Sequence, residues 1–201
     1  MNMNYCDLVR ERAMVLYDAS DQSVSHRMDH IERVLLHARV ISTSFPDVDQ
    51  ELLTIAVLLH DVTSPFNRKH EHVRLSMKTA RDILDETGYP PDRTERVVRI
   101  IAEHSTEDPK NGLLSSVEAR VLFDADKIDG AGPVGLARAF ALFGQQGHSP
   151  GTAIGWYRRK IETALCHMQT DPGRTMLLER LPYVEDFLEK FEAENAWSLK
   201  E

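Results

Sequence analysis

The sequence predicts an all-α protein, on two observations. Apolar residues recur at helical spacing along most of the chain, whereas the strict alternation of a half-buried strand is almost absent. Glycine and proline stand at the ends of the periodic segments, where helices are expected to stop. With 201 residues, 42% of them hydrophobic, the chain suffices for a core of ordinary size. We therefore expect a single domain over residues 1–201, with a core over about 20–150 and C-terminal helices over about 151–195.

Four amphipathic helices are expected in the first half of the chain, each with one apolar stripe. Their inward residues are Ile31, Val34, Leu35, Ala38 and Ile41 in the first, Leu53, Ala56, Val57 and His60 in the second, Met77, Ala80, Ile83 and Leu84 in the third, and Val97, Ile100, Ile101 and His104 in the fourth. Pro46 closes the first of these segments. Gly88, followed by Pro90 and Pro91, is the expected stop of the third, which spans about 73–87.

The second half resumes the helical pattern after a polar stretch, STEDPKNG. One helix is expected from Val117 to Asp126, and a shorter one after the glycines near residue 130. A loop with the sequence GQQGHSPG then precedes the C-terminal part. There the period is repeated by Tyr157, Ile161, Ala164, Leu165 and Met168. Residues 175–193 are expected to form a terminal helix that Pro182 kinks or splits.

Composition excludes several classes of partner. The net charge of −8 comes without any Lys/Arg run, so a sequence-independent grip on a nucleic-acid polymer is not expected. Cations that gather locally would still suit a small anionic substrate. No apolar run approaches the ~20 residues of a membrane helix, and the N-terminus turns charged at once, unlike a signal peptide. Two cysteines, Cys6 and Cys166, make neither a disulfide framework nor a zinc cluster, which favours a reducing cytoplasm. The oligomeric state is not predicted.

Five ionisable side chains share the inward phase of these helices. His30 precedes Val34 by four residues, and His60 and His104 continue the stripes of their own segments. Asp126 and Asp129 follow Leu122 by four and seven residues, which places both on its face. A buried imidazole or carboxylate is costly unless it is paired or bound to a metal. Because several converge from four helices, and Asp61 directly follows His60, a bound metal is the simplest explanation.

Each residue also has a simpler interpretation when taken alone. His104 fits a core histidine bonded to backbone, and His60-Asp61 fits a helix-ending His beside a surface Asp. Asp126 and Asp129 fit a helix-ending charge cluster with Lys127. The complete set favours the metal over these readings. In the basic stretch NRKHEHVRLS, both His70 and His72 are expected to face solvent, with the basic residues there as candidate phosphate contacts.

These residues resemble the HD-domain superfamily of metal-dependent phosphohydrolases. Its pattern is a His in a DHxxRV-like helix, an adjacent His-Asp pair and a distant Asp, which here are His30 in MDHIERV, His60-Asp61 in AVLLHDV and Asp126 in DADKID. The chain further resembles a small bacterial branch described as HD phosphohydrolases or nucleotide pyrophosphohydrolases. Its motifs match HxxxHxxRV from His26 to Val34, the His104-Ser105 step, DADKIDGAGPVGLARAF and TDPGRTMLLERLPYVEDFLEKF. The similarity runs from about residue 20 to 193.

The resemblance implies an HD-type helical bundle with a C-terminal helical extension. It implies a phosphohydrolase acting on a phosphoester or phosphoanhydride, with a nucleotide as the expected substrate. The implied metal ligands are His30, His60, Asp61 and Asp126, a set suited to Mn²⁺, Co²⁺, Ni²⁺, Fe²⁺ or, less well, Mg²⁺. Expected catalytic residues are His104, Lys127 and Asp129, and expected substrate contacts are His26, Arg33 and Arg68. His104 and Asp129 would orient water or carry a proton, and the cations would neutralise phosphate charge.

The sequence departs from the family pattern at one position, and two alternative functions stay open. Ser64 stands where family members that hydrolyse nucleoside monophosphates carry a Glu, so that mechanism is not carried over; the basic stretch Asn67 to His72 favours a substrate with more than one phosphate. A di-iron oxygenase branch of the fold needs two extra histidines, which His70 or His72 together with His104 could supply. A non-catalytic HD signalling or ligand-binding module is disfavoured because all four ligands are present.

Overall fold

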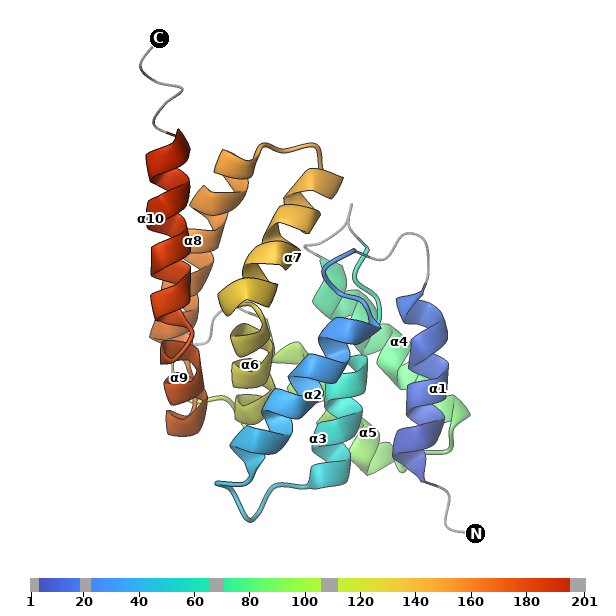
Figure 1. The fold of residues 1–201 in the computed structure, drawn as a ribbon. Helices are drawn as coiled ribbons and strands as arrows, with labels where there is room; N and C mark the ends of the chain where they lie inside the picture. The colour runs from blue at the N-terminus through green and yellow to red at the C-terminus, as the bar shows by residue number, and fades with distance from the viewer. Residues whose placement is uncertain (1–3, 19–22, 66–70, 106–111, 196–201) are drawn as a thin grey trace.

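The computed structural model describes residues 4–18, 23–65, 71–105 and 112–195, and these form ten α-helices joined by loops (Figure 1). The helices are α1 (Tyr5–Tyr17), α2 (Met28–Ser42), α3 (Gln50–Leu59), α4 (His72–Glu86), α5 (Pro91–Ala102), α6 (Val117–Asp129), α7 (Gly132–Gln145), α8 (Pro150–His167), α9 (Asp171–Leu178) and α10 (Leu181–Asn195). The prediction of an all-α fold is confirmed. Among the described residues, no helix combines the length and apolar composition of a membrane span.

Local sequence explains where the helices begin and end. Side-chain oxygens of Asp49, Ser116 and Ser149 accept N–H groups in the first turns of α3, α6 and α8, because those donors have no partner within the helix. After α4 the chain turns at Gly88, whose φ of 70° is unfavourable for other residues. The terminal helix is split as predicted: α9 ends at Leu178, and Pro182 is the second residue of α10.

Helix α1 was not predicted from the sequence. Its buried residues are only Val9, Ala13 and Tyr17, spaced four apart among charged neighbours, so its apolar stripe is narrow. It nevertheless packs against α3. The fully buried Tyr17 hydroxyl donates to the Leu58 carbonyl over 3.1 Å, two residues before His60. The N-terminal helix therefore supports the segment that carries the His-Asp pair.

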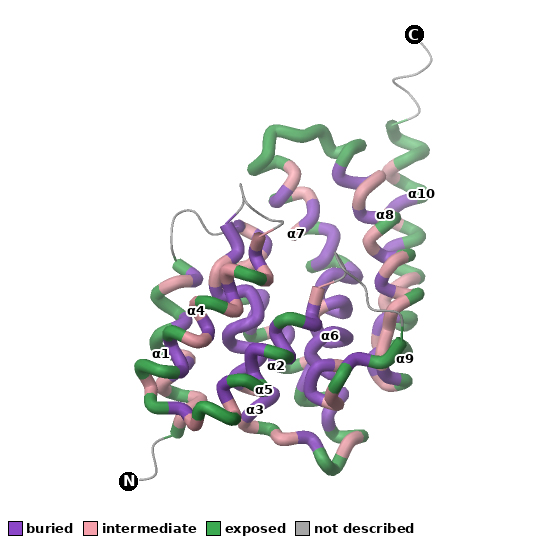
Figure 2. Tube along the Cα trace, turned by 180° about the vertical axis from the view of Figure 1, so that it is seen from behind, coloured by how far each residue is buried: buried purple, intermediate pink, exposed green. Residues whose placement is uncertain are grey.

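The core is centred on α2, α3, α5 and α6. Helix α2 packs on α6 and α3, and α3 also contacts α5 and α6. Helices α7 to α10 form a second group beside α6, on the side opposite α1 and α4 (Figure 1). Helix α6 is buried over most of its length, as Figure 2 shows. Because its last turns carry Asp126, Lys127 and Asp129, ionisable groups are drawn into the centre of the molecule.

Candidate metal centre and substrate cavity

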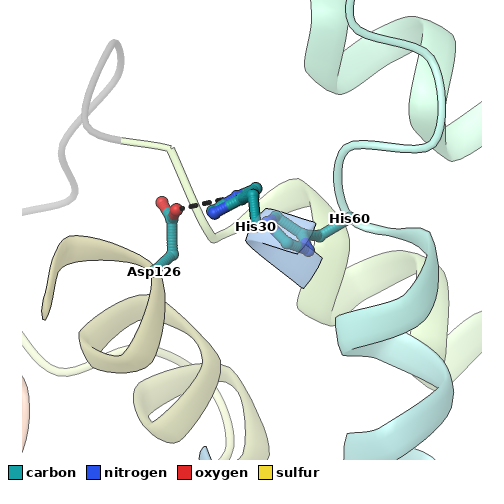
Figure 3. A group of neighbouring side chains, drawn as sticks. All are labelled: His30, His60 and Asp126. Carbon is teal, nitrogen blue, oxygen red and sulfur yellow. Dashed lines mark ion pairs between the residues drawn. The ribbon is translucent and has the colours of Figure 1, made fainter. Parts of the chain in front are cut away.

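The four predicted metal ligands lie close together, although they come from α2, from the segment just after α3 and from α6, and span nearly a hundred residues. The Nε2 atom of His30 on α2 lies 3.7 Å from Asp61 Oδ2 and 3.6 Å from Asp126 Oδ1. His60, the residue after α3, places its Nε2 atom 3.6 Å from Asp61 Oδ2. Figure 3 shows His30, His60 and Asp126 turned toward one another. The ligand atoms of His30, His60 and Asp126 lie close enough together to hold one cation, and Asp61 joins His60 and His104 in an adjoining group that could hold one.

The hydrogen bonds of the two histidines leave their Nε2 atoms available to a metal. His60 Nδ1 donates to the Val57 carbonyl over 2.8 Å, so its proton is on Nδ1. His30 Nδ1 is bonded in the same way to Asp129 Oδ2 over 2.7 Å. Both Nε2 atoms are buried and have no hydrogen-bond partner among the described residues. Two buried imidazole nitrogens that face two carboxylates fit a divalent cation, which would satisfy all of them.

Protonation states also suit a cation. Burial lowers the pKa of His60 to about 4, more than nearby Asp61 raises it, so the imidazole is neutral. Burial alone would raise the pKa of Asp61, but the adjacent His26 and His60 hold that pKa well below its usual range. For Asp126, Lys127 and His30 likewise overcome burial and keep the pKa low. Neutral imidazoles and ionised carboxylates are the forms that bind metals.

Asp129 lies behind His30 and does not line the cavity. Its carboxylate accepts from His30 Nδ1 and from Arg33 Nε, over 2.7 and 2.6 Å, and from Arg138. Burial would raise its pKa, but His30 and Arg138 lower it, so the carboxylate stays ionised. Asp129 was expected to orient water or carry a proton, but its carboxylate is instead bonded to His30, Arg33 and Arg138. A carboxylate in this position fixes the tautomer and orientation of the ligand imidazole.

Arg33 and Arg68 were both expected to contact substrate, and the structure describes only Arg33. Arg33 bonds Asp129 and, over 2.8 Å, Asp29, and it is not among the residues that line the cavity. The expectation that Arg33 binds substrate is corrected on this geometry, because its guanidinium is committed to two carboxylates. Arg68 lies outside the described residues, and so does His70.

Three further histidines surround Asp61. His26 Nε2 lies 3.7 Å from Asp61 Oδ2, and His104 Nε2 lies 3.6 Å from Asp61 Oδ1. His104 stands two residues beyond the end of α5, and its Nδ1 donates to the Ile101 carbonyl over 2.6 Å. His72 was expected to face solvent, and that expectation is wrong: it is 8% exposed, with Nε2 3.9 Å from Asp61 Oδ1. His72 is the first residue of α4, and its ring packs edge-on against the ring of His104.

A cavity of about 340 Å³ opens onto this cluster. This volume lies in the range of small-molecule sites. Near the cluster it is lined by Ser25, His26, Asp61, His72, His104, Ser105, Asp126 and Lys127. Lys127 donates its ammonium protons to Asp126 Oδ2 over 2.6 Å and to the His104 carbonyl over 2.9 Å. The cavity therefore joins the expected ligands to expected catalytic residues.

A second wall of the cavity comes from α7 and α8 and was not predicted. It consists of Gly135, Arg138, Ala139, Leu142, Trp156, Arg159, Lys160, Thr163 and Ala164. Gly135 lets α7 start against the end of α6, since a Cβ there would overlap the Gly130 carbonyl. The signal for the α8 face was the spacing of Trp156, Arg159, Lys160 and Thr163 at i, i+3, i+4 and i+7. It was missed because a polar stripe is ordinarily a solvated one.

Comparison with known proteins identifies the class. A model of the HD domain family matches residues 27–131, slightly more than half of the chain, and the chain therefore belongs to the HD domain family. The matched span contains all four predicted ligands. The resemblance to the HD-domain superfamily inferred from the sequence is confirmed.

Individual relatives cover nearly the whole chain. YpgQ of Bacillus subtilis is 30% identical over 181 residues, which are 86% of each protein. A crystal structure of YpgQ in complex with ADP has a TM-score of 0.72 at 25% identity, covering 94% of this chain and 97% of that one. A Lactobacillus plantarum protein shares the fold with a TM-score of 0.78 at 24% identity, covering 98% of both chains. A protein from an uncultured Thermotogales bacterium, described as a predicted HD superfamily hydrolase, has a TM-score of 0.58 at 26% identity, with 94% and 90% covered.

Proposed function

We propose that this protein is a divalent-metal-dependent phosphohydrolase that cleaves a phosphoanhydride or phosphoester bond of a nucleotide. The observation that carries the proposal is the pair of buried, unpartnered imidazole nitrogens of His30 and His60, which face the carboxylates of Asp61 and Asp126 beside a cavity with cationic residues. The complex of the relative YpgQ with ADP supports a nucleotide as the substrate.

His30, His60, Asp61 and Asp126 would hold the ion, and a borderline nitrogen and oxygen set suits Mn²⁺, Co²⁺, Ni²⁺ or Fe²⁺ better than Mg²⁺. When bound, a divalent ion polarises a phosphoryl oxygen and lowers the pKa of water toward ~7. Asp129 would keep the proton of His30 on Nδ1, so that Nε2 remains a ligand. Arg33 and Arg138 would in turn keep Asp129 ionised and fixed in position.

His104 is proposed to act as the general base that accepts a proton from the attacking water. Because its Nδ1 proton is committed to the Ile101 carbonyl, only Nε2 is free to accept a proton, and that atom lies beside Asp61 at the cavity. Lys127 and, on α8, Arg159 and Lys160 present positive charge along the same cavity. That charge would stabilise the phosphate oxygens as the bond to the leaving group breaks.

A dinuclear iron oxygenase is the second candidate, and one observation favours it. His72 and His104 both approach Asp61 Oδ1, and His60, Asp61 and His104 form a second group able to hold a metal. Such a group beside the first is the arrangement that two ions would need. The phosphohydrolase remains the better supported reading, because cationic residues along the α7–α8 wall suit a substrate with several phosphates.

A metal-resolved hydrolysis screen tests the two candidates together. Chelator-stripped protein would be reloaded separately with Mn²⁺, Co²⁺, Ni²⁺, Fe²⁺ or Mg²⁺ and incubated with nucleoside mono-, di- and triphosphates. We expect phosphate or pyrophosphate release with at least one ion, none from stripped protein, and one bound ion per chain by elemental analysis. Failure to hydrolyse any nucleotide with any ion contradicts the proposal. Two bound irons with a charge-transfer absorption band would favour the oxygenase.

A further inference from the structure

Helix α8 turns one mixed aromatic and cationic face toward the cavity. Trp156, Arg159, Lys160, Thr163 and Ala164 line it, and their spacing of i, i+3, i+4, i+7 and i+8 defines one side of a helix. A neighbouring face of the same helix carries the apolar residues that enter the core, among them Ile154, Tyr157 and Ile161. The two faces meet at Ala164, which is buried in the core and also lines the cavity, and the Trp156 ring packs against the core at the edge of the cavity.

Two neighbours contact the indole of Trp156. Its ring centroid lies 5.3 Å from that of Phe143 on α7, and the Lys160 ammonium lies 5.2 Å from the ring centroid. Ala139 and Leu142 of α7 add apolar surface to the same cavity. The residue is only partly buried, so the ring retains contact with the open space. The cavity therefore joins a polar, metal-facing side to a wall that carries a positioned aromatic ring beside a cation.

We propose that Trp156 is the platform on which the base of the nucleotide stacks, with the Lys160 ammonium moving from over the ring to the phosphates when the base binds. This inference rests on the proposed function and adds to it how the base is recognised. Bases bind aromatic side chains through their faces, and such stacking tolerates any base. Among the described residues that line the cavity, none has a side-chain amide to read base edges. The indole would therefore accept any base, and the strength of binding would follow the area of overlap. Purine nucleotides should bind more tightly than pyrimidine ones, because a purine overlaps the indole more.

Tryptophan fluorescence tests the stacking directly. The chain has two tryptophans, and Trp197→Phe leaves Trp156 as the only one. In this background, with Mg²⁺ present, ADP should quench the emission of Trp156, whereas inorganic pyrophosphate should bind with little quenching. Titration calorimetry on the full chain gives the matching affinities. Trp156→Leu should weaken ADP binding about tenfold or more, the usual effect of removing one stacking partner, and should change pyrophosphate binding less than about twofold.

Two further variants make the test decisive. Trp156→Phe keeps an aromatic face and should restore most of the ADP affinity, which a role in packing alone would not require. Tyr183→Leu removes an exposed aromatic residue on α10, at 49% exposure, and should leave both ligands unaffected. Equal quenching by ADP and pyrophosphate, or equal weakening of both by Trp156→Leu, overturns the stacking while nucleotide hydrolysis still stands. If the wild-type chain neither binds nor hydrolyses any nucleotide, the proposed function and this inference both fall.

Discussion

The expected metal ligands come from residues 27–131 and are deeply placed, whereas the α8 wall of the cavity comes from outside that span and is partly exposed. His30 and His60 are 0% exposed and Asp61 only 3%, while Arg159 on the wall is exposed. Each ligand is also tied to a backbone or side-chain partner close by, as His60 is to Val57. The wall instead presents long side chains whose ends can move with a ligand.

This difference indicates a division of labour. A fixed ligand geometry within the span shared by the family suits a common chemical step, because displacement of one ligand disrupts the whole centre. Arg138 on α7 belongs with that centre, because it bonds Asp129 behind His30. The α8 part of the wall lies outside the matched span, so its residues can change one by one with substrate affinity as the expected readout. We therefore expect substitutions in the ligand cluster to abolish activity and those on the wall to alter substrate affinity by degrees.

Asp61→Asn should produce the largest effect, because Asp61 lies near the ligands His30 and His60 and near His104 and His72. It keeps the shape of the side chain but removes its charge. We expect metal content to collapse and turnover to fall by about 10³-fold or more, since several kcal/mol of transition-state stabilisation go with the ion. Elemental analysis, circular dichroism and nucleotide hydrolysis measure this. Asp82→Asn, an exposed carboxylate on α4, is the matched control and should change none of them.

If Asp61→Asn retained both its ion and its turnover, Asp61 would not be a metal ligand. The expected difference between the ligand cluster and the wall would then fail. A variant that loses its helical signal would report on folding instead. In that case Asp61→Glu provides the second reading, because it keeps the charge and displaces the carboxylate by one methylene.

His104→Ala should lower turnover by roughly a hundredfold, as removal of a positioned acid or base does, and should leave metal content unchanged. His167→Ala is the matched control, because His167 Nδ1 donates to the Thr163 carbonyl in the same manner but lies away from Asp61. Loss of one of two ions together with activity would make His104 a ligand and favour the dinuclear reading. An unchanged variant would leave His104 as a core histidine bonded to Ile101.

Asp129→Asn should weaken metal binding by about 10- to 100-fold, the usual cost of losing the partner that orients a ligand imidazole. The reason is local: an amide no longer supplies the charge that holds the His30 proton on Nδ1. Metal affinity by competition with a chelating dye gives the measurement. Asp29→Asn changes the other carboxylate bonded to Arg33. That carboxylate interacts with the backbone of His30, whereas the imidazole Nδ1 bonds Asp129, so the metal affinity of this variant should match the wild type. Equal affinities in the two variants would show that Asp129 serves only to neutralise Arg33.

The sequence was sufficient for most of the helices, α1 excepted, and for the inward phase of His30 and Asp126, because these follow from periodicity along one segment. The proposed set of four ligands came instead from the resemblance to the HD-domain superfamily. The stripe that contains His30 is read within α2, and the phase of Asp126 is read within α6. The signal for His72 was present as well: it shares the buried stripe of α4 with Ser76 and Ala80, at intervals of four. It was missed because a basic stretch around it suggested a solvated face.

Other features depend on packing between distant segments, which periodicity does not contain. Arg33 meets Asp129 across 96 positions, so its role in holding the carboxylate behind His30 follows from how α2 lies on α6. The position of the α8 wall depends on the direction that α7 takes from its first residue, Gly132, whose φ is 76°. Trp156 and Lys160 face the cavity only because α8 is brought there, and on the sequence alone they form an unremarkable polar stripe.

Arg159→Gln should have the smallest effect and is the sharpest test of a graded wall. Arg159 lines the cavity and is exposed, so solvent screens its attraction to a phosphate. A contribution of at most ~1 kcal/mol corresponds to about a two- to fivefold rise in KM, with kcat and metal content unchanged. The effect should disappear at high salt, because screening already weakens the attraction in the wild type. The adjacent Arg158 pairs with Glu192 of α10 over 2.6 Å and does not line the cavity, so Arg158→Gln should leave KM unchanged. If Arg159→Gln instead lowered kcat or displaced the ion, the wall would be coupled to the ligand cluster, and the division between chemistry and affinity would not hold.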